Sequence, residues 1–481
     1  MRQITLLILL LLPFAIHGQD CDCMSNFKWA KKTFEENDAG FQFALDQKGK
    51  SAYEQHNKTF EEKIAKLDNS DDCIQTIFEW MTFFRSGHIA VRRINQEQSQ
   101  SENEEVEQKV NESFKDWDKI EVDLGTFKKH LNEKVDHGFE GIWKSGSYTI
   151  GIKKVGDAYL GFIIEADGSY WTKGQIKLRI EKDLSATYYM QDHSAQNFES
   201  ATLLGNNYLE LGFITLERLF PETMPEPHLQ RYFKAISARD PYFEKVNANT
   251  ALLRIPRFWA SEKGKIDSVI NANREIILKS KNLIIDLRNN GGGSDASYSV
   301  ILPFLYTNPI RTVGVEYLST KLNNQRMLDF IQKEEYGFDE EDKKWAQESY
   351  DKLSEQIGEF VMLNEHPITE TVLDTIHKYP ENIGILIHEN NGSTTEQFLL
   401  AAKQSKKVKL FGTTTAGVLD ISNMYFVKSP CEEFELGYSL TKSMRIPEMT
   451  IDDKGIQPDY YIDKEIPKYE WIKHVTEILN E

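Results

Sequence analysis

The stretch NNGSTTEQFLLAAK, from Asn390 to Lys403, decides how the fold of this chain is interpreted. It follows an apolar run that ends at Ile387 and predicts a buried strand, and it opens with a tight Asn-Asn-Gly turn. From Ser393 onward the apolar residues recur at helical spacing, so a helix is expected to begin at this serine. Such an arrangement surrounds the hydroxyl with backbone N–H groups that have no partner inside the helix, and these donors can form an oxyanion hole.

The same stretch has a purely structural interpretation. Ser393 and Glu396 stand three residues apart, which is the spacing of a capping box that satisfies the first turn of a helix. A nucleophilic serine also needs a base, and this segment does not contain one. Both interpretations therefore stay open at this point.

Composition and charge are those of an acidic globular protein. The chain has 481 residues, 40% of them hydrophobic and 27% charged. This length fits roughly two to four domains with apolar cores. The net charge of −18 disfavours a nucleic-acid surface or an anionic membrane face, so no nucleic-acid partner is expected.

The first residues, MRQITLLILLLLPFAIHGQ, predict a secretory signal peptide with cleavage after Gly18. The apolar run from Ile4 to Leu12 is too short to span a bilayer, and no later segment is long enough. We therefore expect an exported bacterial protein, periplasmic or extracellular, without stable membrane insertion.

The cysteines predict a disulfide rather than a metal site. In an exported chain, Cys73 is expected to pair with either Cys21 or Cys23. The C-x-C spacing lacks the histidine or second cysteine pair that zinc requires, so we expect no metal and no other cofactor.

Patterning divides the chain into four parts. Amphipathic helical segments such as FEEKIAKL give way, near Gly138, to short alternating runs such as SYTIGIKKV that predict antiparallel strands. From Ala251, strand-like and helical runs alternate, which predicts an α/β domain. We expect a signal peptide at 1–18, a helical region at 19–135, an antiparallel β module at 136–222, and an α/β domain at 245–481 with a helical insert near 323–360.

A second motif, DLRNNGGGSD from Asp286 to Asp295, places three glycines directly after a predicted buried strand. Glycines are costly to order, so a run of them is expected where the backbone adopts positive φ or approaches a bound group. Free N–H groups in such a turn can hold a phosphate or a carbonyl oxygen, but the spacing matches neither the Walker-A nor the dinucleotide pattern. A sharp turn with no other role is the alternative.

Four motifs in this order resemble those of peptidase family S41, the tail-specific (C-terminal processing) and tricorn-like serine peptidases. They lie between Ala251 and Asp463 and read LIIDLRNNGGG, a strand followed by NGSTTE, GTTTAG, and KGIQPDYYID. The resemblance implies an α/β catalytic domain that is crotonase-like (ClpP/crotonase). It also implies Ser393 as nucleophile and oxyanion donors at the backbone N–H groups near Gly291, Gly292 and Thr394.

The base distinguishes two branches of that family. In the tail-specific branch a lysine follows the T-x-G motif, but this chain has Val418 there, which cannot titrate. The tricorn-like branch uses a histidine from the N-terminal region instead. In RSGHIAV, His88 resembles that D-G-H signature, although Ser86 or Arg85 stands where its aspartate would be. The resemblance thus implies His88 as general base.

The tricorn-like branch also supplies two supporting groups. A carboxylate lies three residues before the glycine of the G-I-x-P-D motif, which is Asp452 when counted from Gly455, with Asp453 as the alternative. A second serine lies near the histidine, and Ser86 is the candidate. A simple turn is the other interpretation of the Asp-Asp pair.

We therefore expect an exported serine endopeptidase that hydrolyses protein or peptide substrates through an acyl-enzyme on Ser393. The alternative is a catalytically inactive S41-like protein that binds a peptide or another ligand. The sequence does not give the substrate preference, the oligomeric state or the role of the β module.

Overall fold

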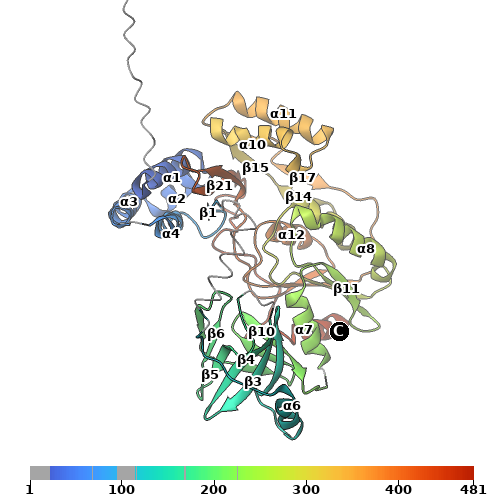
Figure 1. Cartoon of the computed structure of the whole chain (residues 1–481). Helices are drawn as coiled ribbons and strands as arrows, with labels where there is room; N and C mark the ends of the chain where they lie inside the picture. The colour runs from blue at the N-terminus through green and yellow to red at the C-terminus, as the bar shows by residue number, and fades with distance from the viewer. Residues whose placement is uncertain (1–21, 68, 95–113, 115, 167–169, 225) are drawn as a thin grey trace, which may run out of the picture. The chain divides into compact units, whose positions relative to one another are not determined.

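The computed structural model describes residues 22–67, 69–94, 114, 116–166, 170–224 and 226–481 (Figure 1). The expected signal peptide lies outside these ranges. The chain is a mixed α/β protein in two compact units, each built from separate segments of sequence. The first unit joins the chain up to Ile94 with Tyr242–Tyr461, and the second joins Asn95–Pro241 with Ile462–Glu481.

A parallel sheet forms the centre of the first unit. Its strand order is β11-β12-β13-β18-β19-β22, in which β11 is the antiparallel edge. Every residue of β12 and β13 is buried, which explains why these strands read as continuous apolar runs rather than as alternating patterns. The bounds are Tyr242–Lys245 for β11, Thr250–Arg254 for β12, Asn282–Asp286 for β13, Asn382–Ile387 for β18, Val408–Gly412 for β19 and Tyr460–Tyr461 for β22.

Helices between these strands bury one face against the sheet. The core joins Ile266 and Ile270 of α8, Phe398 of α12, and Ile285 and Ile385 of the central strands. Such crossover helices are the usual connection between parallel strands. The connecting elements are η1 (Ala260–Glu262), α8 (Lys263–Ile277), η2 (Asp295–Tyr298), α9 (Leu302–Leu305) and α12 (Thr394–Ala402).

The N-terminal helices belong to this same unit because the strand that follows them pairs with a strand from near the C-terminal end of the unit. β1 (Ala90–Arg93) runs antiparallel to β21 (Phe434–Ser443), with Ala90 opposite Gly437. An aromatic core that includes Phe34 and Trp80 packs against Tyr438 of β21. The helices are α1 (Cys23–Asn37), α2 (Phe41–Lys48), α3 (Lys50–Ile64) and α4 (Ser70–Met81), seen beside β1 and β21 in Figure 1.

The remaining elements of the first unit extend the β21 sheet and form the expected insert. β20 (Ile421–Lys428) and β15 (Val315–Leu318) both pair with β21, and β16 (Phe360–Met362) pairs with β15. The insert contains α10 (Lys321–Gln332), η3 (Glu334–Tyr336) and α11 (Glu340–Ser354), and β14 (Ile310–Val313) pairs with β17 (Ile368–Thr371).

A disulfide between Cys23 and Cys73 joins α1 to α4. It confirms one of the two pairings expected for Cys73. Cys431 is also disulfide-bonded.

The second unit is a nine-stranded antiparallel sheet in the order β7-β6-β5-β4-β3-β2-β10-β9-β8. Its core contains Trp143, Trp171 and Leu178. The strands are β2 (Gly141–Ser145), β3 (Tyr148–Val155), β4 (Ala158–Glu165), β5 (Ile176–Ile180), β6 (Ala186–Tyr189), β7 (Ala195–Phe198), β8 (Thr202–Leu204), β9 (Tyr208–Leu211) and β10 (Ile214–Phe220); the helices are α6 (Leu124–Asn132), α7 (Pro227–Ser237) and α13 (Trp471–Asn480).

The two units divide the chain after Ile94, before Tyr242 and before Ile462, whereas the sequence predicts divisions at residues 135 and 245. The N-terminal helices join the α/β unit through the β1–β21 pairing, which has no signature in local sequence. The last twenty residues group with the β unit, where Tyr469 packs against Tyr232 and the neighbouring apolar cluster. None of the helices in the described ranges is long and apolar enough to cross a membrane.

Ile285→Ala should destabilise the first unit strongly. Its side chain is 0% exposed between β12 and β18, so truncation leaves a cavity and should cost about 2–5 kcal/mol. Urea unfolding followed by circular dichroism measures the change. Val372→Ala, at a position that is 64% exposed, is the matched control and should change the free energy of unfolding by less than about 0.5 kcal/mol. Equal effects of the two variants would contradict the assigned core.

Candidate active site

The site lies where two neighbouring parallel strands end. Asp286, the last residue of β13, stands in register with Leu386 of β18, so the turns that follow the two strands meet. The carboxyl ends of parallel strands are the usual location of sites in α/β sheets. The glycine-rich motif and the Asn-Asn-Gly-Ser motif occupy these two turns.

A buried ion pair fixes the first turn. Asp286 accepts hydrogen bonds from the backbone and guanidinium of Arg288, and Arg254 donates to its backbone carbonyl at 2.9 Å. Burial raises the pKa of Asp286, but the charges of Arg288 and Arg254 outweigh it and lower the pKa to about 2. The carboxylate is therefore ionised throughout the ordinary pH range and holds the start of the turn.

Two buried asparagines tie the turns together. Asn290 Oδ1 accepts from the Gly292 N–H at 3.0 Å and from the Thr395 hydroxyl at 2.9 Å. Asn391 Nδ2 donates to the carbonyls of Leu287 and Asn290, at 2.6 and 2.9 Å. Because both asparagines are fully buried, these bonds are protected from water and set the spacing of the turns.

Ser393 stands at the N-cap of α12 in a strained conformation, with φ of 56° and ψ of −127°. Its side chain makes no capping hydrogen bond. The capping-box interpretation is therefore wrong. Few non-glycine residues adopt this backbone conformation, which is held here by the Ser393 N–H donating to the Val418 carbonyl at 3.0 Å.

The glutamate expected to complete the box has a different partner. Glu396 accepts from the Thr415 hydroxyl at 2.5 Å and from the N–H groups of Gly417 and Val418 at 2.8 and 2.9 Å. Burial raises its pKa, and these hydrogen bonds act in the opposite direction. Glu396 thus anchors the segment that in turn holds the Ser393 backbone.

His88 lies against the serine. Its Nε2 is 3.0 Å from Ser393 Oγ, although the two residues are 305 positions apart. Burial and the nearby charge of Arg85 lower the pKa of His88 to about 4, while the backbone carbonyl of Ile421 and the charge of Asp38 act in the opposite direction. The imidazole is therefore neutral near pH 7 and can accept a proton.

Val418 occupies the position that directly follows the T-x-G motif. A Cβ added at Gly87 would lie 2.4 Å from a Val418 methyl carbon, and one added at Gly392 would lie 2.6 Å from the other. The valine side chain is thus packed between the turn that carries His88 and the turn that carries Ser393. It keeps the two turns in contact without supplying a charge.

The other expected residues do not contact the pair directly. Asp452 accepts from the N–H groups of Leu419, Asp420 and Ile421, at 2.5, 2.6 and 3.2 Å. It acts on His88 through this segment, because the backbone carbonyl of Ile421 interacts with the imidazole. Ser86 is exposed, and among the described residues it hydrogen-bonds neither His88 nor Ser393. The alternative Asp453 has a positive φ of 62°, typical of a turn.

The three expected oxyanion donors differ in availability. The Gly292 N–H is engaged by Asn290, whereas no acceptor within the described ranges is hydrogen-bonded to the N–H of Gly291 or Thr394. A Cβ at Gly292 would lie 2.9 Å from both Ser393 Cβ and the Thr394 nitrogen. The missing side chain at Gly292 therefore leaves the space beside the serine open.

Three further residues support the site and are absent from the sequence-based set. Arg85 and Ser439 donate to the His88 carbonyl, and Asp38 pairs with Arg85. The one signal in the sequence is Arg85 itself, a basic residue in a signature that otherwise has an aspartate at or beside this position. Its partners come from distant segments and give no local signal.

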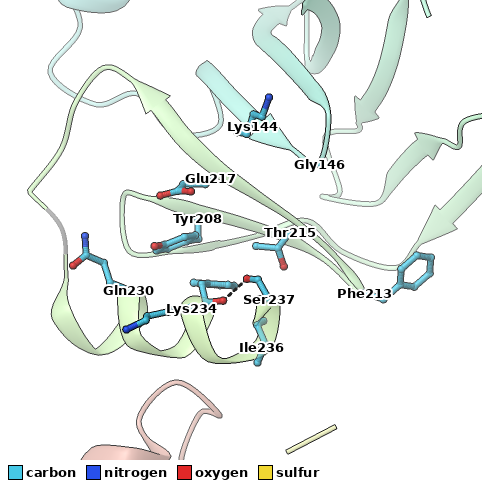
Figure 2. A pocket seen from close by; sticks show the side chains of 11 residues that line it. Lys144, Gly146, Tyr208, Phe213, Thr215, Glu217, Gln230, Lys234, Ile236 and Ser237 are labelled. Atoms are coloured by element: carbon cyan, nitrogen blue, oxygen red, sulfur yellow. Dashed lines mark hydrogen bonds between the residues drawn. The ribbon is translucent and has the colours of Figure 1, made fainter. Parts of the chain in front are cut away.

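A separate cavity of about 710 Å³ lies in the second unit, between the sheet and α7. Its lining includes Tyr208, Thr215 and Glu217 from the strands and Gln230 and Lys234 from the helix (Figure 2). Its size suits a small ligand, and the hydroxyl of Ser237 in its lining donates to the Phe233 carbonyl rather than to a base. Within the described residues, no cluster of three or more His, Cys, Asp or Glu could hold a metal ion.

Comparison with known proteins identifies a matching family. Residues 249–462 match the model of peptidase family S41. Mature CPAF complexed with lactacystin aligns with 95% of this chain and 97% of its own, at 13% identity and a TM-score of 0.50. A single-site mutant of CPAF aligns with 95% of this chain and 96% of its own, at 12% identity and a TM-score of 0.51. At these identities the likeness shows a shared fold alone. No curated protein sequence matches.

Reaction of Ser393 with a fluorophosphonate should depend on pH in an unusual way. Protonation of His88 removes the base, so the labelling rate should fall as the pH is lowered through about 4 rather than through the ordinary value of 6.5. Labelling rates measured across this range, with circular dichroism at each pH to verify folding, test the prediction. Half-loss near pH 6.5 in a folded protein would contradict it.

Gly292→Ala should slow the same labelling by about 100-fold, because the added methyl group occupies the space beside Ser393 where an oxygen must be bound. Its φ of +103° adds strain. Gly291→Ala is the matched control, since its Cβ meets nothing closer than 3.9 Å and the N–H is retained. Similar rates for the two variants would argue against an oxyanion position beside Gly292.

Proposed function

Residues 249–462 belong to peptidase family S41, and from this premise we propose that the protein is a serine endopeptidase acting through an acyl-enzyme on Ser393. The observation that carries the proposal is the separation of 3.0 Å between His88 Nε2 and Ser393 Oγ. A serine hydroxyl is a weak nucleophile until an adjacent base accepts its proton. This pair supplies both groups without a lysine, as in the tricorn-like branch.

The first half of the reaction uses His88 as general base. Nε2 accepts the Ser393 proton while Oγ attacks the carbonyl carbon of the scissile peptide. The peptide C–N bond then breaks, and the imidazolium returns its proton to the leaving amine. The low pKa of His88 favours this return, because a weak base is a strong conjugate acid.

The developing oxyanion is stabilised by backbone donors. The N–H groups of Gly291 and Thr394 are the available pair, and Thr394 lies at the start of α12, where the helix dipole adds positive potential. Gly292 contributes by having no side chain rather than by donating its N–H, which Asn290 already accepts.

The acyl-enzyme is released by the same groups. His88 deprotonates a water molecule, which attacks the ester carbonyl, and the proton passes from His88 to Ser393 Oγ as the C–O bond breaks. In this scheme Asp452 supports the base indirectly, by holding the segment that contains Ile421. Ser86 has no role in these steps.

The fold class, the substrate and the localisation are assigned as part of the same proposal. The parallel sheet with Ser393 after β18 suits a crotonase-like catalytic domain, and the substrate is a protein or peptide. The N-terminal sequence suits an exported bacterial protein. One observation favours the alternative of an inactive binding protein: no carboxylate among the described residues is hydrogen-bonded to the buried Nδ1 of His88.

Ser393→Ala should abolish peptide-bond cleavage, and His88→Gln should reduce kcat by at least about 10³-fold, because each variant removes one half of the nucleophile–base pair. Digestion of casein and of a peptide library, analysed by mass spectrometry, measures both. Lys407→Gln is the control, since Lys407 donates to the His377 carbonyl and not to the site. Binding of peptides by a wild-type protein that cleaves none of them would establish the alternative function.

A further inference from the structure

The second nitrogen of the His88 imidazole has no carboxylate partner among the described residues. In serine hydrolases with a Ser-His-Asp triad, a carboxylate on Nδ1 holds the ring. Here the buried Nδ1 has no hydrogen-bond partner of good geometry within the described residues, and the imidazole interacts with the Ile421 backbone carbonyl. Because no carboxylate among those residues orients the ring, the position of the base depends on how its backbone is held.

Hydrogen bonds to the backbone fix His88 instead. The Arg85 guanidinium donates to the Gly87 carbonyl at 3.0 Å and to the His88 carbonyl at 2.9 Å. The Ser439 hydroxyl donates to the same His88 carbonyl at 3.1 Å. His88 has a φ of +52°, an uncommon backbone conformation for a residue other than glycine. These three bonds join its backbone to neighbouring segments in that conformation.

A second layer fixes the arginine. The Asp38 carboxylate accepts hydrogen bonds from both terminal nitrogens of Arg85, at 2.7 and 2.5 Å. This is the fork geometry that arginine makes with carboxylates. The same carboxylate accepts the N–H groups of Gly40 and Ser439, at 2.9 and 3.0 Å. Asp38 is thus fully satisfied. A Cβ on Gly40 would lie 2.8 Å from the guanidinium, so the packing around the pair is tight.

We propose that Arg85 and Asp38 form a buried clamp that positions the general base: acting with Ser439, they hold the His88 backbone so that Nε2 faces Ser393. The clamp takes the place of a carboxylate on Nδ1. This inference rests on the proposed function for its kinetic consequences. The placement of His88 by the clamp is a structural claim that holds whether or not the protein cleaves peptides.

The clamp also predicts opposite electrostatic effects for its two members. The charge of Arg85 lowers the pKa of His88 and that of Asp38 raises it, so removing each should move this pKa in opposite directions. Other charged groups on the elements packed here are Glu396, Asp452 and Asp420. Glu396 and Asp452 accept hydrogen bonds from backbone N–H groups, and Asp420 is paired with Arg445. The variants leave all of these partners in place.

The experiment compares Arg85→Met, Arg85→Lys, Asp38→Asn and Ser439→Ala with the wild type. We measure kcat and KM for a cleaved peptide, and the His88 pKa by NMR of histidine-selectively labelled protein, with the signal assigned from His88→Gln. Asp329→Asn is the matched control, because Asp329 is a buried, paired carboxylate of the same unit that contacts Lys333 and Tyr425 rather than the site.

Arg85→Met and Asp38→Asn should each lower kcat about 100-fold with KM changed less than about threefold, since a misplaced base slows the reaction without removing substrate contacts. Arg85→Lys should lose activity while leaving the His88 pKa nearly unchanged, because it keeps the charge but not the fork. Ser439→Ala removes one hydroxyl and should lower kcat about tenfold. This variant keeps the test decisive if the Arg85 and Asp38 variants fail to fold. The His88 pKa should rise in Arg85→Met and fall in Asp38→Asn.

The control Asp329→Asn should keep wild-type kcat. Kinetics within about threefold of wild type in Arg85→Met and Ser439→Ala would overturn the inference, and so would equal losses in the Asp329→Asn control. A wild-type protein that cleaves no peptide would refute the proposed function instead. The NMR titration would then test the clamp by itself. A His88 pKa that rises in Arg85→Met and falls in Asp38→Asn supports the clamp, and a His88 pKa that is unchanged in both variants overturns it.

Discussion

Backbone pairing between β1 and β21 is the constraint on which the site depends. Ala90 stands opposite Gly437, and just before β1 the Ser439 hydroxyl donates to the His88 carbonyl. A shift of one residue would turn every side chain of β1 to the opposite face. The register of one short strand therefore fixes where the N-terminal histidine meets the serine of the α/β unit.

Buried carboxylates organise the rest of the site. Asp38, Asp286, Glu396 and Asp452 each hold a turn or a segment by accepting backbone N–H groups or arginine side chains. Burying a carboxylate is costly unless its oxygens are satisfied, and each of these four has several donors. The result is a set of rigid turns around one strained serine and one neutral histidine, with apolar Val418 between them.

Much of the α/β unit could be predicted because its signals are local. The apolar runs at NLIID and NIGILI are buried strands, and the helix after Ser393 begins one residue later than expected. The sequence does not reveal the role of Glu396, because S-x-x-E spacing is also compatible with a cap and its donors at residues 415–418 are distant in sequence. The division into units also differed, since the N-terminal helices and the last helix group with segments far along the chain.

The sequence by itself determined the elements that carry the proposed chemistry: a serine at a strand-to-helix turn, a glycine-rich turn after a buried strand, and a histidine after the N-terminal helices. Periodicity and turn residues are properties of neighbouring positions, so the two turns can be read directly, whereas the histidine was indicated by the resemblance to S41 peptidases. Only the tertiary structure decided that Nε2 of His88 lies at Ser393 Oγ, that Asp452 acts on a backbone segment, and that Arg85 with Asp38 holds the histidine. These contacts join residues up to some four hundred positions apart, and they form only when strand register and burial bring the segments together.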